Sequence, residues 1–442
     1  MTNFNKYLLL LLFIVSSLVA CKTTEEFSGY SYDPEGVIDT FDKEITSQHK
    51  RTIGFQEDSV WFSNEFNGAR VNDVYRVGKN HYKVIINPEI TPINNSPWYG
   101  FHVWSDSETE IKIELNYPEG RQRYLPTLSR DGGKSWTKAN SSIFTRDRES
   151  GNGVLSLRTG SKPTWVSAQE ALNSNQFSDW LADQSALPFI QQQVVGNSHQ
   201  GRPLHLFKIA EQSEIPTKGV ILVYNRQHPP EVPGYKVGLY FLEEILSDTE
   251  LAKQFRAYFD VWAFPMINPD GVDNGHWRTN AAGVDLNRDW EYFRQPETEA
   301  VRNTILPLKE RSDKKVFYGI DFHSTGGNKF YPINKDIETF PLHFTYHWAD
   351  KIIDKLPELN LDVEPFDTVS PIAKNWTFKT FGVDAVTFEV WDEISRDKIE
   401  PFGNVAARTF MELMIREFEE AFPDETEEFK LKNKISEKEL QY

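Results

Sequence analysis

The chain has 442 residues, of which 39% are hydrophobic and 26% are charged, a balance typical of a soluble globular protein. This length is sufficient for two domains. The formal net charge of −17 argues against nucleic acid and anionic lipid surfaces as binding partners.

An apolar segment near the N-terminus predicts export. Residues 7–20 are mostly apolar, are too few for a transmembrane helix and end in small residues, so residues 1–20 are predicted to be a signal peptide. Leu18-Val-Ala-Cys21 resembles the lipobox of bacterial lipoproteins, in which the cysteine is acylated. This resemblance implies a bacterial envelope protein anchored only through lipid on Cys21, facing the periplasm or cell exterior. The alternative is an ordinary signal peptide followed by a free thiol. Residues 21–35 would be a tether.

Residues 36–165 consist of short β-type runs separated by turn-forming residues. The clearest runs are Val60–Phe62, His81–Ile86, Trp98–Trp104 and Glu110–Leu115. Their alternation and spacing predict an all-β, antiparallel sandwich-like domain. The many aromatic residues here are interpreted as core, with a sugar-binding platform as the alternative.

Residues 166–193 are predicted to be a helical connector in which Ser167 is the N-cap. Residues 194–423 then alternate between strand and helix patterns, which predicts an α/β domain with a doubly wound mixed sheet. Strands are expected at 204–209, 220–224, 259–264, 316–321 and 385–390, and helices at 235–246, 296–309, 342–356 and 405–421. Residues 424–442 are predicted to be a charged, solvated tail.

A set of histidine and carboxylate residues predicts a catalytic zinc site. His228 and Glu231 form an H-x-x-E pair just after the predicted strand 220–224, where open α/β sheets bind ligands. With His323 they supply a two-His, one-Glu set, which in catalytic zinc sites leaves the fourth position to water. Glu389 would be the base, with a buried salt-bridge role as its alternative. We therefore expect one Zn²⁺ per chain.

Six motifs, in order, resemble those of the M14 zinc carboxypeptidases. They are His228–Glu231, Asn268-Pro-Asp-Gly271, Trp277-Arg278, Asp285-Leu-Asn-Arg288, Asp321-Phe-His323 and Thr387-Phe-Glu389. Upstream, Phe62–Arg70, Trp98–Val103 and Tyr124–Pro126 look like the N-terminal domain of the cytosolic carboxypeptidase subfamily, whose known members remove glutamates from protein tails.

The resemblance implies a role for each matching residue. His228, Glu231 and His323 match the zinc ligands of the family. Glu389 matches the carboxylate that takes a proton from the attacking water and passes it to the leaving amine. Arg278 matches the cation that stabilises the oxyanion.

Three further residues match substrate-binding positions. Asn287 and Arg288 match the pair that binds the terminal carboxylate of the substrate, a task suited to the planar guanidinium. A gapless alignment counted back from Glu389 places Lys374 at the base of the specificity pocket, which implies a preference for C-terminal glutamate or aspartate. The alternative is a lysine that points to solvent.

The chain also departs from the family pattern. Members often carry a mobile tyrosine before the catalytic glutamate, whereas no tyrosine occurs between His347 and Glu389. Pro230 stands where the cytosolic subfamily commonly has glycine.

The sequence thus predicts a zinc metallocarboxypeptidase that hydrolyses the C-terminal amide bond of peptide or peptide-like substrates with a free carboxylate. Two other enzymatic functions are alternatives, a γ-D-glutamyl muropeptide peptidase and an N-acyl amino acid deacylase. The alternative of another class is a catalytically silent binding lipoprotein.

Overall fold

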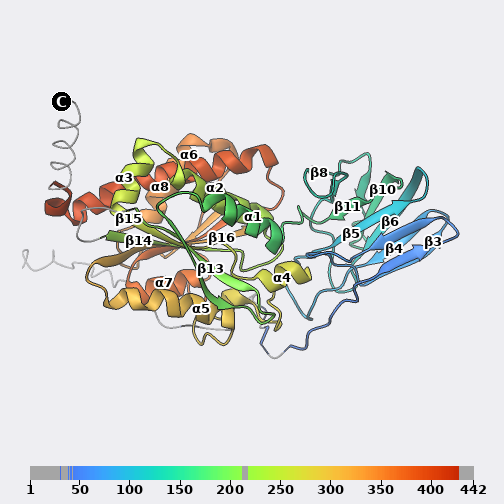
Figure 1. Ribbon diagram of the computed structural model, residues 1–442, viewed down its shortest axis with the longest axis horizontal. Helices are drawn as coiled ribbons and strands as arrows, with labels where there is room; N and C mark the ends of the chain where they lie inside the picture. The colour runs from blue at the N-terminus through green and yellow to red at the C-terminus, as the bar shows by residue number, and fades with distance from the viewer. Residues whose placement is uncertain (1–29, 31–37, 39, 42, 212–217, 428–442) are drawn as a thin grey trace, which may run out of the picture.

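The computed structural model describes residues 30, 38, 40, 41, 43–211 and 218–427. The predicted signal peptide, Cys21 and residues 428–442 of the predicted tail lie outside the described residues. An N-terminal β domain lies at one end of a larger α/β domain (Figure 1). None of the described helices combines the length and the hydropathy that a membrane span requires.

The N-terminal domain is built from two β-sheets. One has the strand order β1-β2-β5-β11-β7-β8 and the other β3-β4-β6-β10-β9. The strands are β1 (Thr52–Phe55), β2 (Val60–Ser63), β3 (Asp73–Gly78), β4 (His81–Ile85), β5 (Gly100–Ser105), β6 (Thr109–Asn116), β7 (Thr127–Ser129), β8 (Thr137–Lys138), β9 (Phe144–Arg146), β10 (Gly153–Thr159) and β11 (Thr164–Ser167).

The predicted sandwich differs from the structure in one pairing. β4 runs parallel to β6, although an antiparallel domain was expected. The chain leaves β4 for the other sheet, forms β5 there and returns as β6 in the original direction. A crossover of this kind gives parallel neighbours, whereas a hairpin gives antiparallel ones.

The aromatic residues of this domain have two different surroundings. Phe62, Tyr82 and Trp98 are buried in the core of the sandwich, as the core interpretation predicted. Trp61 and Trp104 are only half-buried and stack on each other with ring centroids 6.3 Å apart. Core packing therefore explains part of the aromatic content but not all of it.

The connector contains a helix that begins later than predicted. Ser167 is not an N-cap, because it is the last residue of β11 and its hydroxyl donates to the Tyr99 carbonyl at 3.1 Å. Helix α1 (Ser174–Gln184) begins after Asn173, whose side chain accepts from the Asn175 N–H within a capping box. Strand β12 (Ile190–Asn197) already starts inside the predicted connector.

The α/β domain contains a mixed sheet with the order β12-β13-β15-β14-β16-β19-β17-β18. The strands not yet given are β13 (Pro203–Ile209), β14 (Lys218–Asn225), β15 (Phe259–Phe264), β16 (Lys314–Thr325), β17 (Lys329–Pro332), β18 (Asp362–Val363) and β19 (Asp384–Trp391). β15, β14, β16 and β19 run parallel to one another, and β13 and β17 are antiparallel to their neighbours in this group. All five predicted strands are present.

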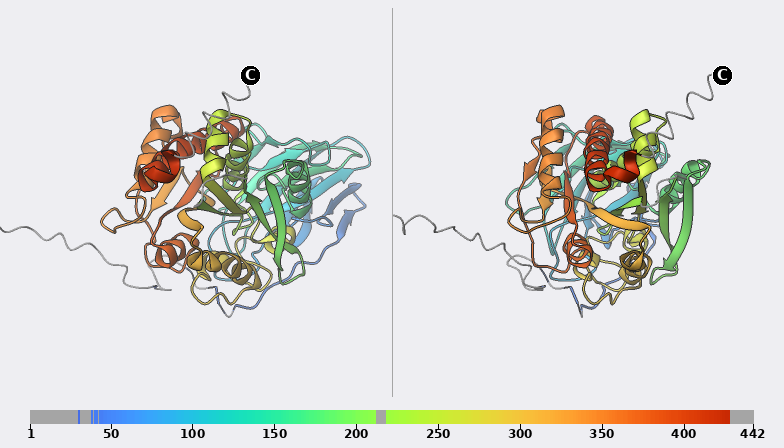
Figure 2. Two further views of the ribbon diagram at one scale, coloured as in Figure 1. Left: turned by 60° about the vertical axis from the view of Figure 1, so that its left-hand side comes forward. Right: turned by 90° about the vertical axis from the view of Figure 1, so that its left-hand side faces the viewer.

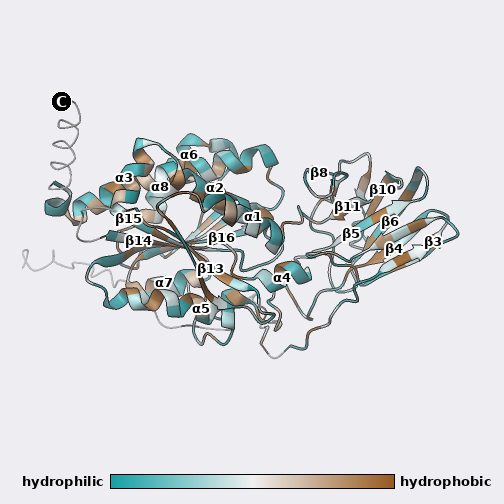
Figure 3. Cartoon of the chain, in the orientation of Figure 1, coloured by the Kyte–Doolittle hydropathy of each residue, from teal (hydrophilic) through white to brown (hydrophobic). Residues whose placement is uncertain are grey.

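Helices cover both faces of this sheet, which confirms the predicted doubly wound arrangement. α2, α3, α6 and α8 lie on one face, and α5 and α7 lie on the other (Figures 1 and 2). Their bounds are α2 (Val232–Leu246), α3 (Glu250–Tyr258), α5 (Pro296–Ile305), α6 (Phe344–Lys355), α7 (Ala373–Phe381) and α8 (Ile399–Ala421), with α4 (Pro269–Asn274) near the domain junction and 3₁₀ turns at Leu286–Arg288, Leu306–Glu310, Pro357–Leu359 and Arg396–Lys398. Figure 3 shows hydrophobic residues on the central strands and hydrophilic ones on the outer helix faces.

The two domains share part of one hydrophobic core. Val232 and Trp277 belong to the α/β domain, yet both are fully buried in the cluster that forms the core of the sandwich. The Trp277 indole N–H donates to the Trp98 carbonyl at 3.1 Å. The N-terminal domain is therefore packed directly against the segment that precedes Arg278.

Candidate active site

The predicted metal ligands and base meet at one edge of the α/β sheet. His228 and Glu231 follow β14, His323 lies near the end of β16, and Glu389 lies near the end of β19. β16 pairs with both β14 and β19 in parallel, and His323 is directly in register with Glu389. Because parallel strands end on the same side of a sheet, residues far apart in the sequence are brought together here.

The start of α2 holds Glu231 against β16. The helix begins at Val232 with Pro233 in its first turn, a position that proline suits. A Cβ atom on Gly234 would lie 2.0 Å from the His323 carbonyl oxygen, so only glycine permits this close approach. The Gly234 N–H donates to the Ser324 hydroxyl at 2.7 Å.

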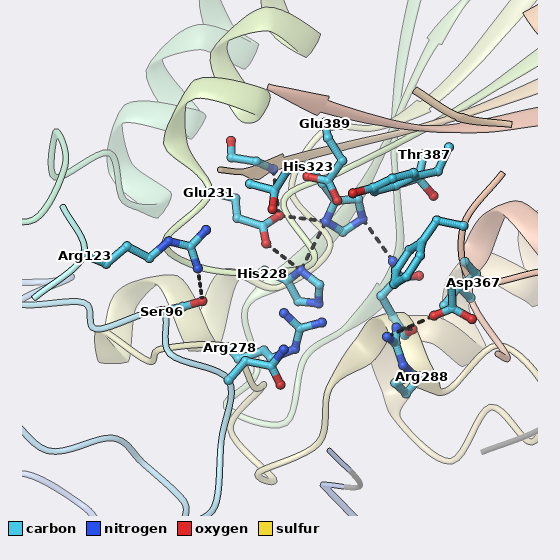
Figure 4. A pocket seen from close by; sticks show the side chains of 17 residues that line it. Ser96, Arg123, His228, Glu231, Arg278, Arg288, His323, Asp367, Thr387 and Glu389 are labelled. Atoms are coloured by element: carbon cyan, nitrogen blue, oxygen red, sulfur yellow. Dashed lines mark hydrogen bonds and ion pairs between the residues drawn. The ribbon is translucent and has the colours of Figure 1, made fainter. Parts of the chain in front are cut away.

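His228, Glu231 and His323 place three ligand atoms around one point (Figure 4). His228 Nδ1 lies 2.9 Å from Glu231 Oε1 and 3.1 Å from His323 Nδ1, and His323 Nδ1 lies 2.7 Å from Glu231 Oε2. Tetrahedral zinc with ligands at roughly 2.0–2.1 Å would separate its ligand atoms by about 3.3 Å. The three side chains therefore fit a zinc ion with small adjustments.

Two further carboxylates orient the histidine rings. His228 Nε2 lies 2.8 Å from Asp285 Oδ1, and His323 Nε2 lies 2.8 Å from Asp321 Oδ2. A carboxylate at Nε2 fixes the proton on that nitrogen and leaves the Nδ1 lone pair for a metal. Burial lowers the pKa of His323, but the charges of Asp321 and Glu231 outweigh it and raise this pKa well above its ordinary value. Such an excess of negative charge favours a bound cation.

Glu389 has the environment of a catalytic base. Among the residues that the structure describes, its buried Oε2 atom has no hydrogen-bond partner and its carboxylate forms no ion pair. Burial, together with the negative charge of Glu231, raises the pKa of Glu389 to about 8. The alternative of a structural salt bridge therefore finds no support in the described part of the chain.

Arg278 is held between the two domains. Its Nε atom donates to Asp285 Oδ2 at 2.6 Å, so one carboxylate contacts both this cation and the His228 ring. Glu89 of the N-terminal domain accepts from the backbone N–H groups of Trp277, Arg278 and Thr279 at 2.7, 3.0 and 2.9 Å. Glu89 is fully buried, and no motif in the sequence pointed to this role.

Asn287 and Arg288 form the opposite side of the site. Asn287 contacts His323 Nε2 with its amide nitrogen at 3.1 Å and accepts from the Ala373 N–H at 3.0 Å. Arg288 forms an ion pair of 3.2 Å with Asp367, whereas its buried Nε atom has no partner within the described residues. Arg288 lines the pocket, and its guanidinium has more N–H donors than these contacts use, so donors remain for an anionic group of a ligand.

These residues enclose a pocket of about 290 Å³. Every predicted catalytic, metal and carboxylate-binding residue lines it: His228, Glu231, Arg278, Asn287, Arg288, His323 and Glu389. Other lining residues were not predicted, among them Asn94, Ser96, Arg123, Tyr331, Phe366, Asp367 and Thr387.

Lys374 lies behind the pocket rather than in its lining. Its ammonium is buried and donates to the carbonyl oxygens of Pro332 and Phe366 at 3.3 and 3.0 Å. Phe366 itself lines the pocket. Burial lowers the pKa of Lys374 to about 8. The side chain therefore does not point to solvent, and its charge is separated from the pocket by the Phe366 backbone.

Tyr331 supplies a tyrosine that the sequence motifs did not reveal. It lies on β17, its ring centroid is 5.1 Å from that of Phe366, and it lines the pocket. Burial first, and then the charge of Glu389, raises the pKa of Tyr331 to about 12, so it is a neutral donor at ordinary pH.

Residues 179–395 match the family described as zinc carboxypeptidase. These residues span most of the α/β domain, and this domain belongs to the zinc carboxypeptidase family. Cytosolic carboxypeptidase 6 of Caenorhabditis elegans is 23% identical over 283 residues, which cover 60% of the chain and 62% of that protein. Cytosolic carboxypeptidase 2 of Macaca fascicularis is 31% identical over 163 residues, which cover 35% of the chain and 19% of that protein. The chain thus spans less than two thirds of either relative.

The fold is also shared with solved structures. A metallo-carboxypeptidase from Burkholderia cenocepacia superposes with a TM-score of 0.65 at 18% identity, covering 82% of the chain and 100% of that structure. The α/β domain alone makes up a smaller part of the chain than the 82% that superposes. The likeness in fold therefore includes the N-terminal domain.

Proposed function

We propose that the chain is a zinc metallocarboxypeptidase that hydrolyses the C-terminal amide bond of peptides with a free terminal carboxylate. One observation carries the proposal: the three converging ligand atoms of His228, Glu231 and His323 share a pocket with the Glu389 carboxylate, whose buried Oε2 atom has no hydrogen-bond partner among the described residues. Zinc bound there would act as a Lewis acid and lower the pKa of water.

The protein side chains divide the remaining tasks by their positions. Arg288, assisted by Asn287, would hold the terminal carboxylate of the substrate through charge-assisted hydrogen bonds. Arg278 would stabilise the negative charge that develops on the carbonyl oxygen, because it is a fixed cation beside the metal ligands. Glu389 would accept a proton from the attacking water and deliver it to the leaving amine.

A preference for acidic C-terminal residues is part of this proposal. Lys374 is the cation expected from the sequence to attract such side chains. Its ammonium lies one backbone segment behind the pocket, so it would act by attraction across the Phe366 carbonyl rather than by direct contact. We expect a preference for glutamate over glutamine of at most about tenfold in kcat/KM, because a direct hydrogen bond to a charged group would contribute more than an attraction across a backbone segment.

The test of this function compares peptides that differ only at the C-terminus. A free carboxylate should be required, and its conversion to an amide should cost on the order of 2–5 kcal/mol of transition-state binding, as for a truncated buried charge pair. Equal cleavage of free and amidated peptides would contradict exopeptidase activity. Muropeptides and N-acyl amino acids belong in the same panel, because selective hydrolysis of either would reassign the substrate class.

We further propose that the protein is a bacterial lipoprotein anchored through Cys21 and facing the periplasm or cell exterior. The support is the lipobox-like Leu18-Val-Ala-Cys21 after an apolar segment. Cys21→Ser should abolish acylation and release the protein from membranes. Intact-mass analysis of membrane-extracted protein showing no lipid would return the segment to an ordinary signal peptide.

A further inference from the structure

The N-terminal domain forms one wall of the candidate active site. Asn94, Ser96 and Arg123 line the pocket, although all three precede the catalytic domain in the sequence. Asn94 and Ser96 lie between β4 and β5, and Arg123 lies between β6 and β7. Of these, Arg123 carries the charge.

Hydrogen bonds hold this arginine in a fixed orientation. Its Nε and Nη2 atoms donate to Asp392 Oδ2 at 2.9 and 2.6 Å, and Nη1 donates to the Asn95 carbonyl and the Ser96 hydroxyl, both at 3.0 Å. The neighbouring Leu125 N–H donates to Glu393 Oε1 at 3.0 Å. The guanidinium is therefore tied both to its own domain and to the chain that follows β19.

Arg123 still has capacity for a ligand. A guanidinium has five N–H donors, and the four contacts above use four of them. The Arg123 side chain is 27% exposed, whereas Asp392 is 6% exposed and does not line the pocket. The cation therefore faces the pocket, while its counter-ion lies behind it.

The position of Arg123 relative to Arg288 indicates which part of a substrate it would meet. Figure 4 shows the two arginines on opposite sides of the metal ligands, with His228 between them. In the proposed function, Arg288 takes the carboxylate of the residue to be released. The rest of the peptide must then leave the metal ligands on the other side, toward Arg123.

We propose that Arg123 forms a subsite for a carboxylate side chain of the substrate on the amino-terminal side of the scissile bond. A planar guanidinium fixed by internal bonds matches a carboxylate in geometry and charge. The inference rests on the proposed function for the direction of the peptide. It makes the N-terminal domain a determinant of specificity for acidic peptide tails.

The experiment compares peptides with one C-terminal residue and either glutamate or glutamine at the first or second position before the scissile bond. Wild type should prefer glutamate at one of these positions by about tenfold in kcat/KM, since hydrogen bonds to partly exposed charges lie at the lower end of their range. Arg123→Gln should bring this ratio close to one. Arg121→Gln is the matched control, because Arg121 is exposed, lies on the same loop and does not line the pocket.

Three results would overturn the subsite. The first is that wild type shows no preference at either position, and the second is that Arg123→Gln leaves the preference unchanged. The third is that Arg123→Gln lowers kcat/KM equally for both peptides, which would place Arg123 on the substrate backbone. If Arg123→Gln does not fold, Asp392→Asn takes its place. Removal of the counter-ion should raise the glutamate preference, and a ratio that does not rise contradicts the proposal.

A binding measurement separates this inference from the proposed function. Wild type that releases no C-terminal residue from any peptide would refute the carboxypeptidase proposal. The subsite is then judged by calorimetry in the Glu389→Gln background, with the same peptide pair. Tighter binding of the glutamate peptide that disappears on adding Arg123→Gln supports the subsite, and equal affinities reject it.

Discussion

At the scale of single residues, Glu389 and the metal ligands should respond differently to substitution. Glu389→Gln preserves volume but cannot take a proton, and Glu389 is not one of the three converging ligands. We expect a folded, zinc-loaded protein whose kcat is at least ~10²-fold lower, within the usual range for general acid–base catalysis. Steady-state kinetics combined with metal analysis test this, and a near wild-type kcat would place the base elsewhere.

His323→Ala should instead remove the metal. The variant leaves only His228 and Glu231 of the three ligand atoms that lie 2.7–3.1 Å apart. Two ligands do not make the three-residue set of a catalytic zinc site. Metal analysis after dialysis should show loss of zinc in this variant and about one ion per chain in Glu389→Gln. Retention of zinc by His323→Ala would exclude this histidine from the site.

The ionisation of Lys374 gives the proposed acidic preference a pH signature. Burial lowers the pKa of this ammonium to about 8, so it is charged below that pH and neutral above it. The ratio of kcat/KM for peptides ending in glutamate and glutamine should therefore fall as pH rises through about 8. Titration of Glu389 affects both peptides alike, so the ratio isolates Lys374. Lys374→Met should show a low ratio at every pH, and a pH-independent preference in wild type would rule out this lysine.

The site residues that could be predicted from the sequence have a recognisable spacing along the chain, whereas those that could not be predicted have none. His228 and Glu231 stand three positions apart after a buried strand, and zinc chemistry restricts the residue types. Asp285 and Asp321 stand in the same motifs, but their contact with histidine Nε2 atoms depends on three-dimensional geometry. Glu89 and Arg123 come from another domain, and no spacing along the chain connects them to the site.

At the scale of elements, the sequence predicted the strands and helices that bury apolar residues on one side or along a continuous run. β15 was predicted at its observed bounds, and β14 was recognised as a buried apolar run. Helix α7 was missed because three of its five consecutive buried residues, Ala373–Thr377, are polar, so it shows neither an apolar run nor a one-sided apolar pattern. β12 was missed because it is a largely exposed edge strand. For α3 a usable signal existed, since Thr249 caps it and Glu250 lies in its first turn.

The loop after β4 provides a prediction about how one element positions another. Glu89→Ala would leave the backbone N–H groups of residues 277–279 without this acceptor, and those of Trp277 and Thr279 are buried. Buried unsatisfied groups cost about 1–3 kcal/mol each, so we expect a loss of at least about 2 kcal/mol in unfolding free energy. Because Arg278 would also shift, kcat should fall with little change in KM.

Two comparisons make this test specific for Glu89. Glu89→Gln retains one side-chain oxygen. Glu89 Oε1 alone accepts from the backbone N–H groups of Arg278 and Thr279 and from the Thr279 hydroxyl. Glu89→Gln should therefore recover most of the stability and activity. Glu110→Ala removes an exposed glutamate of the same domain and should change neither quantity. Wild-type kcat in a folded Glu89→Ala protein would show that Arg278 does not depend on this contact.

At the scale of the whole molecule, the fold class and the order of the two domains followed from the sequence, but their coupling did not. Sandwich and α/β patterns are local, because they depend on periodicities of two and of 3.6 residues. The junction depends on Trp277, which in sequence belongs to a catalytic-domain motif and in space to the core of the sandwich. Such packing across domains leaves no periodic signal.

This shared core predicts that the two domains unfold together. Trp277 is fully buried against the N-terminal domain, and a Cβ atom on Gly120 of that domain would lie 2.9 Å from its ring. We expect one transition, with coincident far-UV circular dichroism and tryptophan fluorescence curves and equal calorimetric and van't Hoff enthalpies. Trp277→Ala should cost about 3–5 kcal/mol, as large aromatic truncations do, and should separate the unfolding of the two domains. Tyr75→Ala is the control, because Tyr75 is 53% exposed on β3 and should leave the single transition in place. Two separate transitions in the wild-type protein would show that the domains are thermodynamically independent despite their common core.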